Sequence, residues 1–136
     1  MPADFLDTNV LVYVASADAA KAEQAEALIA RGGVISVQVL NELANVARRK
    51  MRLSWAETRA FLEPLHALFD VRPPTTETHA SALELAERFG LSIYDSLIVA
   101  AALEAECHVL WSEDLQHGMR FGSLRVANPF RRAAER

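Results

Sequence analysis

The 136-residue sequence has little cysteine and no long hydrophobic run. Its one cysteine, Cys107, cannot form a disulfide within the chain, so a reducing compartment suits it best. The longest uninterrupted apolar stretch, residues 97–103, is far shorter than the ~20 residues that a membrane-spanning helix needs. Residues 1–4 lack a basic region ahead of an apolar run, so we expect no signal peptide. These absences predict a cytoplasmic protein with no membrane segment.

The sequence also lacks a Gly/Ser-rich linker, a low-complexity segment and an internal repeat. Its length is typical of one domain. A hydrophobic content of 51% is enough to build a core without disulfides. We therefore predict a single domain over residues 1–136.

An excess of basic charge is missing too, because the formal net charge is −4. By itself this value speaks against a nucleic-acid partner. The sum depends, however, on which acids face that partner. Leaving out four acids that are candidates for cation binding, Asp7, Glu42, Asp95 and Asp114, brings the formal charge to zero. The net charge therefore does not indicate whether the protein binds nucleic acid.

Short apolar runs alternate with longer helical segments, a pattern typical of βαβ units and a parallel sheet. A loop holding Gly118 and Gly122 is expected before the last strand. Strands are predicted near residues 5–6, 34–37, 69–71, 109–111 and 124–126. Helices are predicted near residues 10–14, 19–31, 38–50, 76–89 and 92–106, and one more is predicted to begin at the capping box of Ser54 and Glu57.

Four acidic residues fall close to the predicted carboxyl ends of strands. Asp7 directly follows the first strand, and Asp114 lies just past the strand at residues 109–111. Glu42 is one turn into the helix after the second strand, and Asp95 is in the first turn of a long apolar helix. Ligands of open parallel sheets bind outside the carboxyl ends of the strands. The four carboxylates are therefore predicted to meet at one sheet edge.

Carboxylates brought together repel one another unless a cation lies among them. Hard oxygen ligands without histidine or cysteine select Mg²⁺ or Mn²⁺ over zinc. The histidines show no paired ligand spacing, so zinc is not expected: they are His66, His79, His108 and His117. An all-carboxylate metal site suits hydrolysis of phosphodiesters.

Each acid also has a purely structural interpretation. Asp7 is a good N-cap for the helix after it, and Asp95 can form a capping pair with Ser92. Glu42 can be a solvent-facing helix residue, and Asp114 can cap a turn. We favour a shared site because it accounts for all four positions at once.

Ordered segments along nearly the whole chain carry a family resemblance. They read FLDTNVLVY at residues 5–13, ISVQVLNE at 35–42, LSIYDSLI at 91–98, LWSEDLQHG at 110–118 and NPF at 128–130. In this order the segments resemble a PIN domain, of the kind found in VapC-type toxins of bacterial toxin–antitoxin pairs.

The resemblance implies a three-layer α/β/α fold with a central parallel sheet. It also implies an endoribonuclease that depends on Mg²⁺, with Mn²⁺ as the alternative. The partners implied are an RNA substrate, an antitoxin that blocks the site and a second copy of the chain in a homodimer.

The first three acids of the family carry over onto Asp7, Glu42 and Asp95. The fourth carries over onto Asp114, although the adjacent Glu113 is an alternative. As a mechanism, Asp7, Asp95 and Asp114 would coordinate Mg²⁺. Glu42 would bind a second ion or orient the attacking water.

Other residues receive supporting roles from the same resemblance. Ser112 stands where the family has a serine or threonine that supports the water of the metal, and Thr8 and Asn9 would order the loop around Asp7. A basic cluster follows Glu42 on its helix and is interpreted either as contacts to RNA phosphates or as a solvated face: Arg48, Arg49 and Lys50.

Three other functions are alternatives to this assignment. A haloacid-dehalogenase-like phosphatase needs a second acid two residues after the first, where this sequence has Asn9. A non-catalytic module that binds RNA or protein is disfavoured because all four acids are present. A PIN nuclease that processes RNA without an antitoxin stays open.

Overall fold

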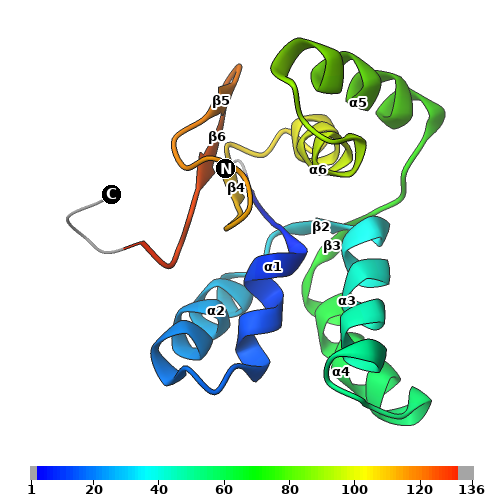
Figure 1. Cartoon of the computed structure of the whole chain (residues 1–136), viewed down its shortest axis with the longest axis vertical. Helices are drawn as coiled ribbons and strands as arrows, with labels where there is room; N and C mark the ends of the chain where they lie inside the picture. The colour runs from blue at the N-terminus through cyan, green and yellow to red at the C-terminus, as the bar shows by residue number, and fades with distance from the viewer. Residues whose placement is uncertain (1–2, 132–136) are drawn as a thin grey trace.

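A computed structural model describes residues 3–131, so both ends of the predicted domain over residues 1–136 lie outside the described residues. Within this range the chain forms one six-stranded sheet covered by helices (Figure 1). The strands are β1 (Asp4–Leu6), β2 (Val34–Ser36), β3 (Asp70–Arg72), β4 (Val109–Trp111), β5 (Arg120–Phe121) and β6 (Leu124–Ala127).

The strands lie in the order β3-β2-β1-β4-β6-β5. Five of them are parallel, and β5 runs antiparallel to β6. The chain moves outward from β1 to β3 and then returns to place β4 on the other side of β1. The carboxyl ends of β1 and β4 therefore mark the topological switch point, where ligands of such sheets bind.

Helices cover both faces of the sheet. Figure 1 shows α5 and α6 on one side and α1 to α4 on the other. This arrangement follows from right-handed crossovers, because the chain reverses its direction across the sheet after β3. The predicted three-layer α/β/α fold is confirmed, with a sheet that is mostly parallel. The helices are α1 (Thr8–Leu11), the short 3₁₀ helix η1 (Val12–Ala15), α2 (Ala19–Arg31), α3 (Val37–Arg49), α4 (Trp55–Leu68), α5 (Thr76–Phe89) and α6 (Ile93–Glu104).

Local signals account for most helix boundaries. The Ser54 hydroxyl accepts the Glu57 N–H at 3.0 Å, and the Glu57 carboxylate accepts the Ser54 N–H at 2.9 Å, so the predicted capping box is confirmed. Gly90 ends α5 in the left-handed conformation, with φ of 69°. The predicted bounds of the helices at residues 19–31 and 76–89 are also confirmed.

Several element boundaries differ from the prediction by one or two residues, and three of the differences have a local cause. Val37 begins α3 rather than ending a strand, because the Ser36 side chain accepts the Val39 N–H and caps the helix. Helix α6 ends two residues early because Glu106 adopts a positive φ of 57°. The segment holding Gly122 is not all loop, since β5 and β6 form a hairpin around it. The two-residue Gly-Ser connection of that hairpin was the signal in the sequence.

The core lies on both faces of the central strands, against α6 on one face and against α1 to α4 on the other. Phe5 on β1 and Leu110 on β4 are fully buried, as is Val99 on α6. Helix α6 is buried on most sides because it packs between α5 and the sheet, and this packing fixes the position of its first turn. None of the described helices is long and apolar enough to cross a bilayer.

Candidate metal centre

Asp7 lies where β1 ends and α1 begins, directly at the switch point. Its main-chain N–H donates to the Trp111 carbonyl of β4 at 3.0 Å. Its Oδ1 accepts the Thr8 N–H at 2.7 Å and thereby caps α1. The residue is only 5% exposed. The predicted capping role is therefore present, and it fixes the carboxylate at the sheet edge.

Two side chains hold the second oxygen of Asp7. The Ser112 hydroxyl donates to Oδ2 at 2.9 Å, and the Asn9 amide donates to the same atom at 3.1 Å. The Asn9 carbonyl oxygen in turn accepts the Glu113 N–H at 2.8 Å. These bonds tie the loop after β1 to the loop after β4. The structure thus places Asn9 and Ser112 directly around Asp7.

Glu42 reaches the same edge from α3. The Thr8 hydroxyl donates to its Oε1 at 2.6 Å, which links the start of α1 to the helix after β2. The Gln38 amide lies one turn earlier on α3, with its Nε2 3.5 Å from Oε2 of Glu42. Glu42 is half-buried, so it is not the fully solvated helix residue of the structural interpretation.

The electrostatics of Asp7 show that the acids are neighbours. The pKa of Asp7 is raised to about 6, mainly by burial and to a smaller extent by the negative charges of Glu42 and Asp114. The hydrogen bonds from Ser112 and Thr8 act in the opposite direction, because they stabilise the carboxylate. Two of the other predicted acids, Glu42 and Asp114, therefore act on Asp7 at the switch point.

Asp95 occupies the first turn of α6, where its N–H donates to the Ser92 hydroxyl at 3.1 Å. The preceding residue, Tyr94, accepts the Gln38 amide on its carbonyl oxygen at 3.1 Å. Gln38 thus connects the start of α6 with Glu42. The charges that raise the pKa of Asp7 are those of Glu42 and Asp114, whereas the start of α6 is linked to the acids through Gln38.

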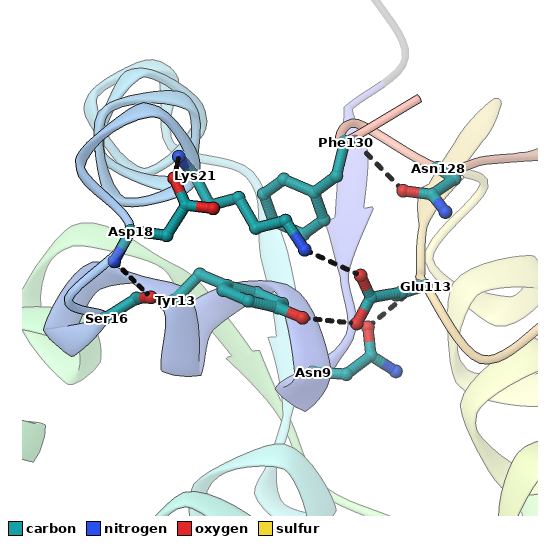
Figure 2. A network of polar contacts seen from close by, with 8 residues as sticks. All are labelled: Asn9, Tyr13, Ser16, Asp18, Lys21, Glu113, Asn128 and Phe130. Carbon is teal, nitrogen blue, oxygen red and sulfur yellow. Dashed lines mark hydrogen bonds and ion pairs between the residues drawn. The ribbon is translucent and has the colours of Figure 1, made fainter. Parts of the chain in front are cut away.

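Glu113 and Asp114 differ in their surroundings, as Figure 2 shows for Glu113. The Tyr13 hydroxyl donates to Oε1 of Glu113 at 2.7 Å, and Lys21 Nζ lies 4.0 Å from Oε2. Both oxygens of Glu113 therefore engage η1 and α2. Asp114 is exposed and acts on the charge of Asp7.

The Tyr13 ring anchors this network. Its centroid is 4.4 Å from that of Phe130, and Lys21 Nζ lies 4.9 Å over the Tyr13 ring. The hydrogen bond to Glu113 raises the pKa of Tyr13 to about 12, with burial as a second cause. Sequence reasoning did not single out Tyr13, Lys21 or Gln38. Of these, only Gln38 could be expected from the sequence, because it lies four residues before Glu42 and therefore on the same face of the helix.

The chemical type of the candidate ligands suits a hard divalent cation. All the candidate ligands are carboxylates, and within residues 3–131 no salt bridge neutralises Asp7, Glu42, Asp95 or Asp114. In the described part of the chain no three acidic, histidine or cysteine side chains form a closed cluster around one position. The acids lie near one edge of the sheet. Their side chains have to move closer together before several of them can bind the same ion.

The basic residues after Glu42 are in two different environments. The Arg48 guanidinium donates to the Leu53 carbonyl at 2.7 Å and lies 4.1 Å over the Trp55 ring, so it stabilises the connection between α3 and α4. Arg49 and Lys50 are exposed. They lie about 10 Å further along the helix than Glu42.

Comparison with known proteins identifies a family. The sequence model of the PIN domain matches residues 5–118, a range that contains all four acids. None of the curated proteins compared matches the sequence.

Solved structures of bacterial toxin–antitoxin proteins share the fold. The Mycobacterium tuberculosis toxin VapC20, described as cleaving the sarcin–ricin loop, superposes with a TM-score of 0.66 at 21% identity, over 82% of this chain and 89% of its own. VapBC2 from Rickettsia felis, bound to a promoter DNA fragment, has a TM-score of 0.66 at 21% identity, over 92% and 97%. A toxin–antitoxin complex from Klebsiella pneumoniae reaches 0.71 at 18% identity, over 93% and 98%.

Proposed function

Since the chain belongs to the PIN-domain family, we propose that it is a metal-dependent endoribonuclease and the toxin of a toxin–antitoxin pair. One observation carries the proposal: the buried carboxylate of Asp7 lies at the switch point with the charges of Glu42 and Asp114 acting on it. A buried carboxylate with uncompensated negative charges beside it is stabilised by a cation. The shared fold with VapC-type proteins supports the toxin assignment.

We assign Asp7, Asp95 and Asp114 as ligands of Mg²⁺, with Mn²⁺ as the alternative. When bound, the ion would lower the pKa of the attacking water and offset the charge that develops on the phosphate. Asp114 is preferred over Glu113, because both oxygens of Glu113 engage Tyr13 and Lys21.

The remaining residues hold and orient the acids. Ser112 and Asn9 fix Oδ2 of Asp7, so its carboxylate keeps one orientation during the reaction. The Thr8 hydroxyl holds Oε1 of Glu42 in place. The Glu42 carboxylate then orients the attacking water by accepting a hydrogen bond from it. In-line attack on the phosphodiester then leaves a 5′-phosphate and a 3′-hydroxyl. Arg49 and Lys50 are the exposed candidates for contacts to RNA phosphates.

The proposed partners follow from the acidic edge and the family. A nuclease that attacks its host's RNA has to be held inactive, and an antitoxin segment that presents an arginine to the carboxylates would do this. Trp55 on α4 is 60% exposed and is a candidate for contact with the antitoxin, whereas Phe61 packs partly against the core. We also propose a homodimer and a cytoplasmic location.

The first experiment is cleavage of a total RNA pool. Discrete cuts are expected with Mg²⁺, and none are expected with EDTA or with Asp7→Asn. Glu26→Gln, which removes an exposed acid on α2, is the matched control and should cleave like wild type. Cleavage by Asp7→Asn at the wild-type rate would refute the proposed mechanism. A folded protein that cuts no RNA under any condition would be a binding module instead.

Growth of a bacterial host separates the toxin from an RNA-processing nuclease. Induced wild-type protein should arrest growth, and Asp7→Asn should not. Cleavage in vitro without growth arrest would favour a processing enzyme that needs no antitoxin. The phosphatase alternative finds no support, because Asn9 donates its amide to Asp7 where such an enzyme needs a second acid.

A further inference from the structure

A cavity of about 430 Å³ lies beside the candidate metal centre. It is enclosed by the first half of α3, the connection from β3 to α5, and α6, so it opens at the carboxyl edge of β2 and β3. Its volume falls within the range of small-ligand sites. Its wall is apolar at Leu97 and Ala101, and its polar groups include Gln38, Asn41 and Arg72.

We propose that this cavity binds the base of one nucleotide of single-stranded RNA next to the cleaved phosphodiester, with the Tyr94 ring as its stacking surface. The proposal rests on the proposed nuclease function and adds the residues that select the sequence around the cut.

Tyr94 has the exposure and the position that such a role requires. It is 66% exposed, and no aromatic ring among the described residues packs against it. It lines the cavity from the first turn of α6 and directly precedes Asp95. Unstacked RNA bases are recognised by stacking on exposed aromatic rings of this kind.

Gln38 connects the cavity to the acids. Its amide donates to the Tyr94 carbonyl at 3.1 Å and lies 3.5 Å from the Glu42 carboxylate, so one side chain borders both the cavity and the metal centre. A base seated here is therefore adjacent to the reacting phosphate. Asn41, on the same helix and exposed, can offer a donor and an acceptor to the edge of the base.

The charges around the cavity suit a nucleotide. The Arg72 Nε donates to Asp70 at 2.9 Å, yet 47% of the Arg72 side chain stays exposed and can reach a phosphate. The acid in the wall, Glu104, accepts the Thr78 hydroxyl at 2.8 Å, which holds one of its oxygens. An apolar wall, an exposed ring, amide groups and an arginine are the set that binds a base and its phosphate.

The test maps cut sites across total RNA for wild type, Tyr94→Ala and Tyr94→Phe. Wild type should prefer a particular base at a fixed position beside the cut. Tyr94→Ala should lose that preference and raise KM about tenfold, with kcat much less affected, because one stacking contact is removed. Tyr94→Phe should retain both properties. Leu83→Ala, which truncates a side chain that is 52% exposed on α5, is the control and should resemble wild type.

A binding measurement separates this proposal from the catalytic one. In the Asp7→Asn background, Tyr94→Ala should weaken the binding of a fluorescent single-stranded RNA about tenfold. Wild-type cleavage with unchanged base preference and KM in Tyr94→Ala would overturn the cavity proposal alone and assign the cavity to another ligand, such as a protein segment. A Tyr94→Ala protein that loses only kcat would also overturn it, because the effect would then be on Asp95. If wild type cuts no RNA, the nuclease function and the cavity proposal both fail.

Discussion

The Ser112 hydroxyl donates a 2.9 Å hydrogen bond to Oδ2 of Asp7, although 105 positions separate the two residues in the sequence. Both side chains are nearly inaccessible to solvent. The bond joins the loops after β1 and β4 across the switch point, and it lowers the pKa of a carboxylate that burial raises. Ser112 is therefore a positioning residue for Asp7.

Replacing Ser112 by alanine should weaken the candidate site without unfolding the protein. The Asp7 carboxylate loses one donor, so its pKa rises and its orientation is less fixed. We expect a loss of about tenfold in kcat/KM, as for removal of a hydrogen bond to a charged group, together with a higher Mg²⁺ requirement. Ser112→Thr should restore much of the activity because the hydroxyl is kept. Ser123→Ala, in the exposed hairpin turn, is the control. An unchanged Mg²⁺ requirement in Ser112→Ala would contradict the positioning role.

Asp7→Asn should stabilise the protein in the absence of metal. The pKa of Asp7 is raised from 3.8 to about 6 in the folded state. The folded state then binds the proton more tightly than the unfolded state does, so stability falls as the pH rises from about 4 to 6. At pH 7 the charged form costs on the order of 1–3 kcal/mol. We expect a higher Tm for Asp7→Asn at pH 7 in EDTA, and a flatter dependence of stability on pH between 4 and 6.

Added Mg²⁺ should remove the stability advantage of Asp7→Asn over wild type. An ion that binds only the folded state raises its stability, so added Mg²⁺ should raise the Tm of wild type in thermal unfolding. Asp7→Asn should show little response because a central ligand is missing. An equal shift of Tm in both proteins would place the bound ion elsewhere.

Asp114→Asn and Glu113→Gln should have different effects. Asp114 acts on the charge of Asp7, so its replacement should reduce cleavage strongly and raise the Mg²⁺ concentration needed for half-maximal activity. Glu113 is held by Tyr13 and Lys21, so Glu113→Gln should mainly lower the Tm by a few degrees. Tyr13→Phe should resemble Glu113→Gln. Cleavage assays and thermal unfolding of the three variants separate the two roles, and a Glu113→Gln protein that loses its metal response would reverse the assignment.

Cys107 should be unreactive in the folded protein. It is 3% exposed, and burial, assisted by the charge of Asp4, raises the pKa of its thiol to about 11. A thiol of this kind carries little thiolate at pH 8. We expect slow labelling by an aromatic disulfide reagent at pH 8 and rapid labelling in denaturant. Because the chain has one cysteine, all labelling reports on this position, and fast labelling without denaturant would show that the end of α6 opens readily.

The sequence by itself determined the local structure, because local structure depends on residues that are near one another in the chain. The capping box of Ser54 and Glu57 sets the start of α4, and Gly90 sets the end of α5. Alternating apolar and helical segments predicted βαβ units and a parallel sheet, and the resemblance to a PIN domain implied the three-layer fold. The position of the acids after the strands predicted that they share an edge. The hairpin around Gly122 also has a local signal, its two-residue Gly-Ser turn.

The interactions between distant residues, in contrast, depend on how the layers of the fold pack together. Asp114 acts on the charge of Asp7, whereas the adjacent Glu113 contacts Tyr13 and Lys21, and this difference arises from contacts between distant segments. The bridge from Gln38 to Tyr94 forms because α3 and α6, on opposite faces of the sheet, approach at its edge. Contacts between distant segments depend on how the layers pack, and neither residue spacing nor hydrophobic pattern encodes that packing.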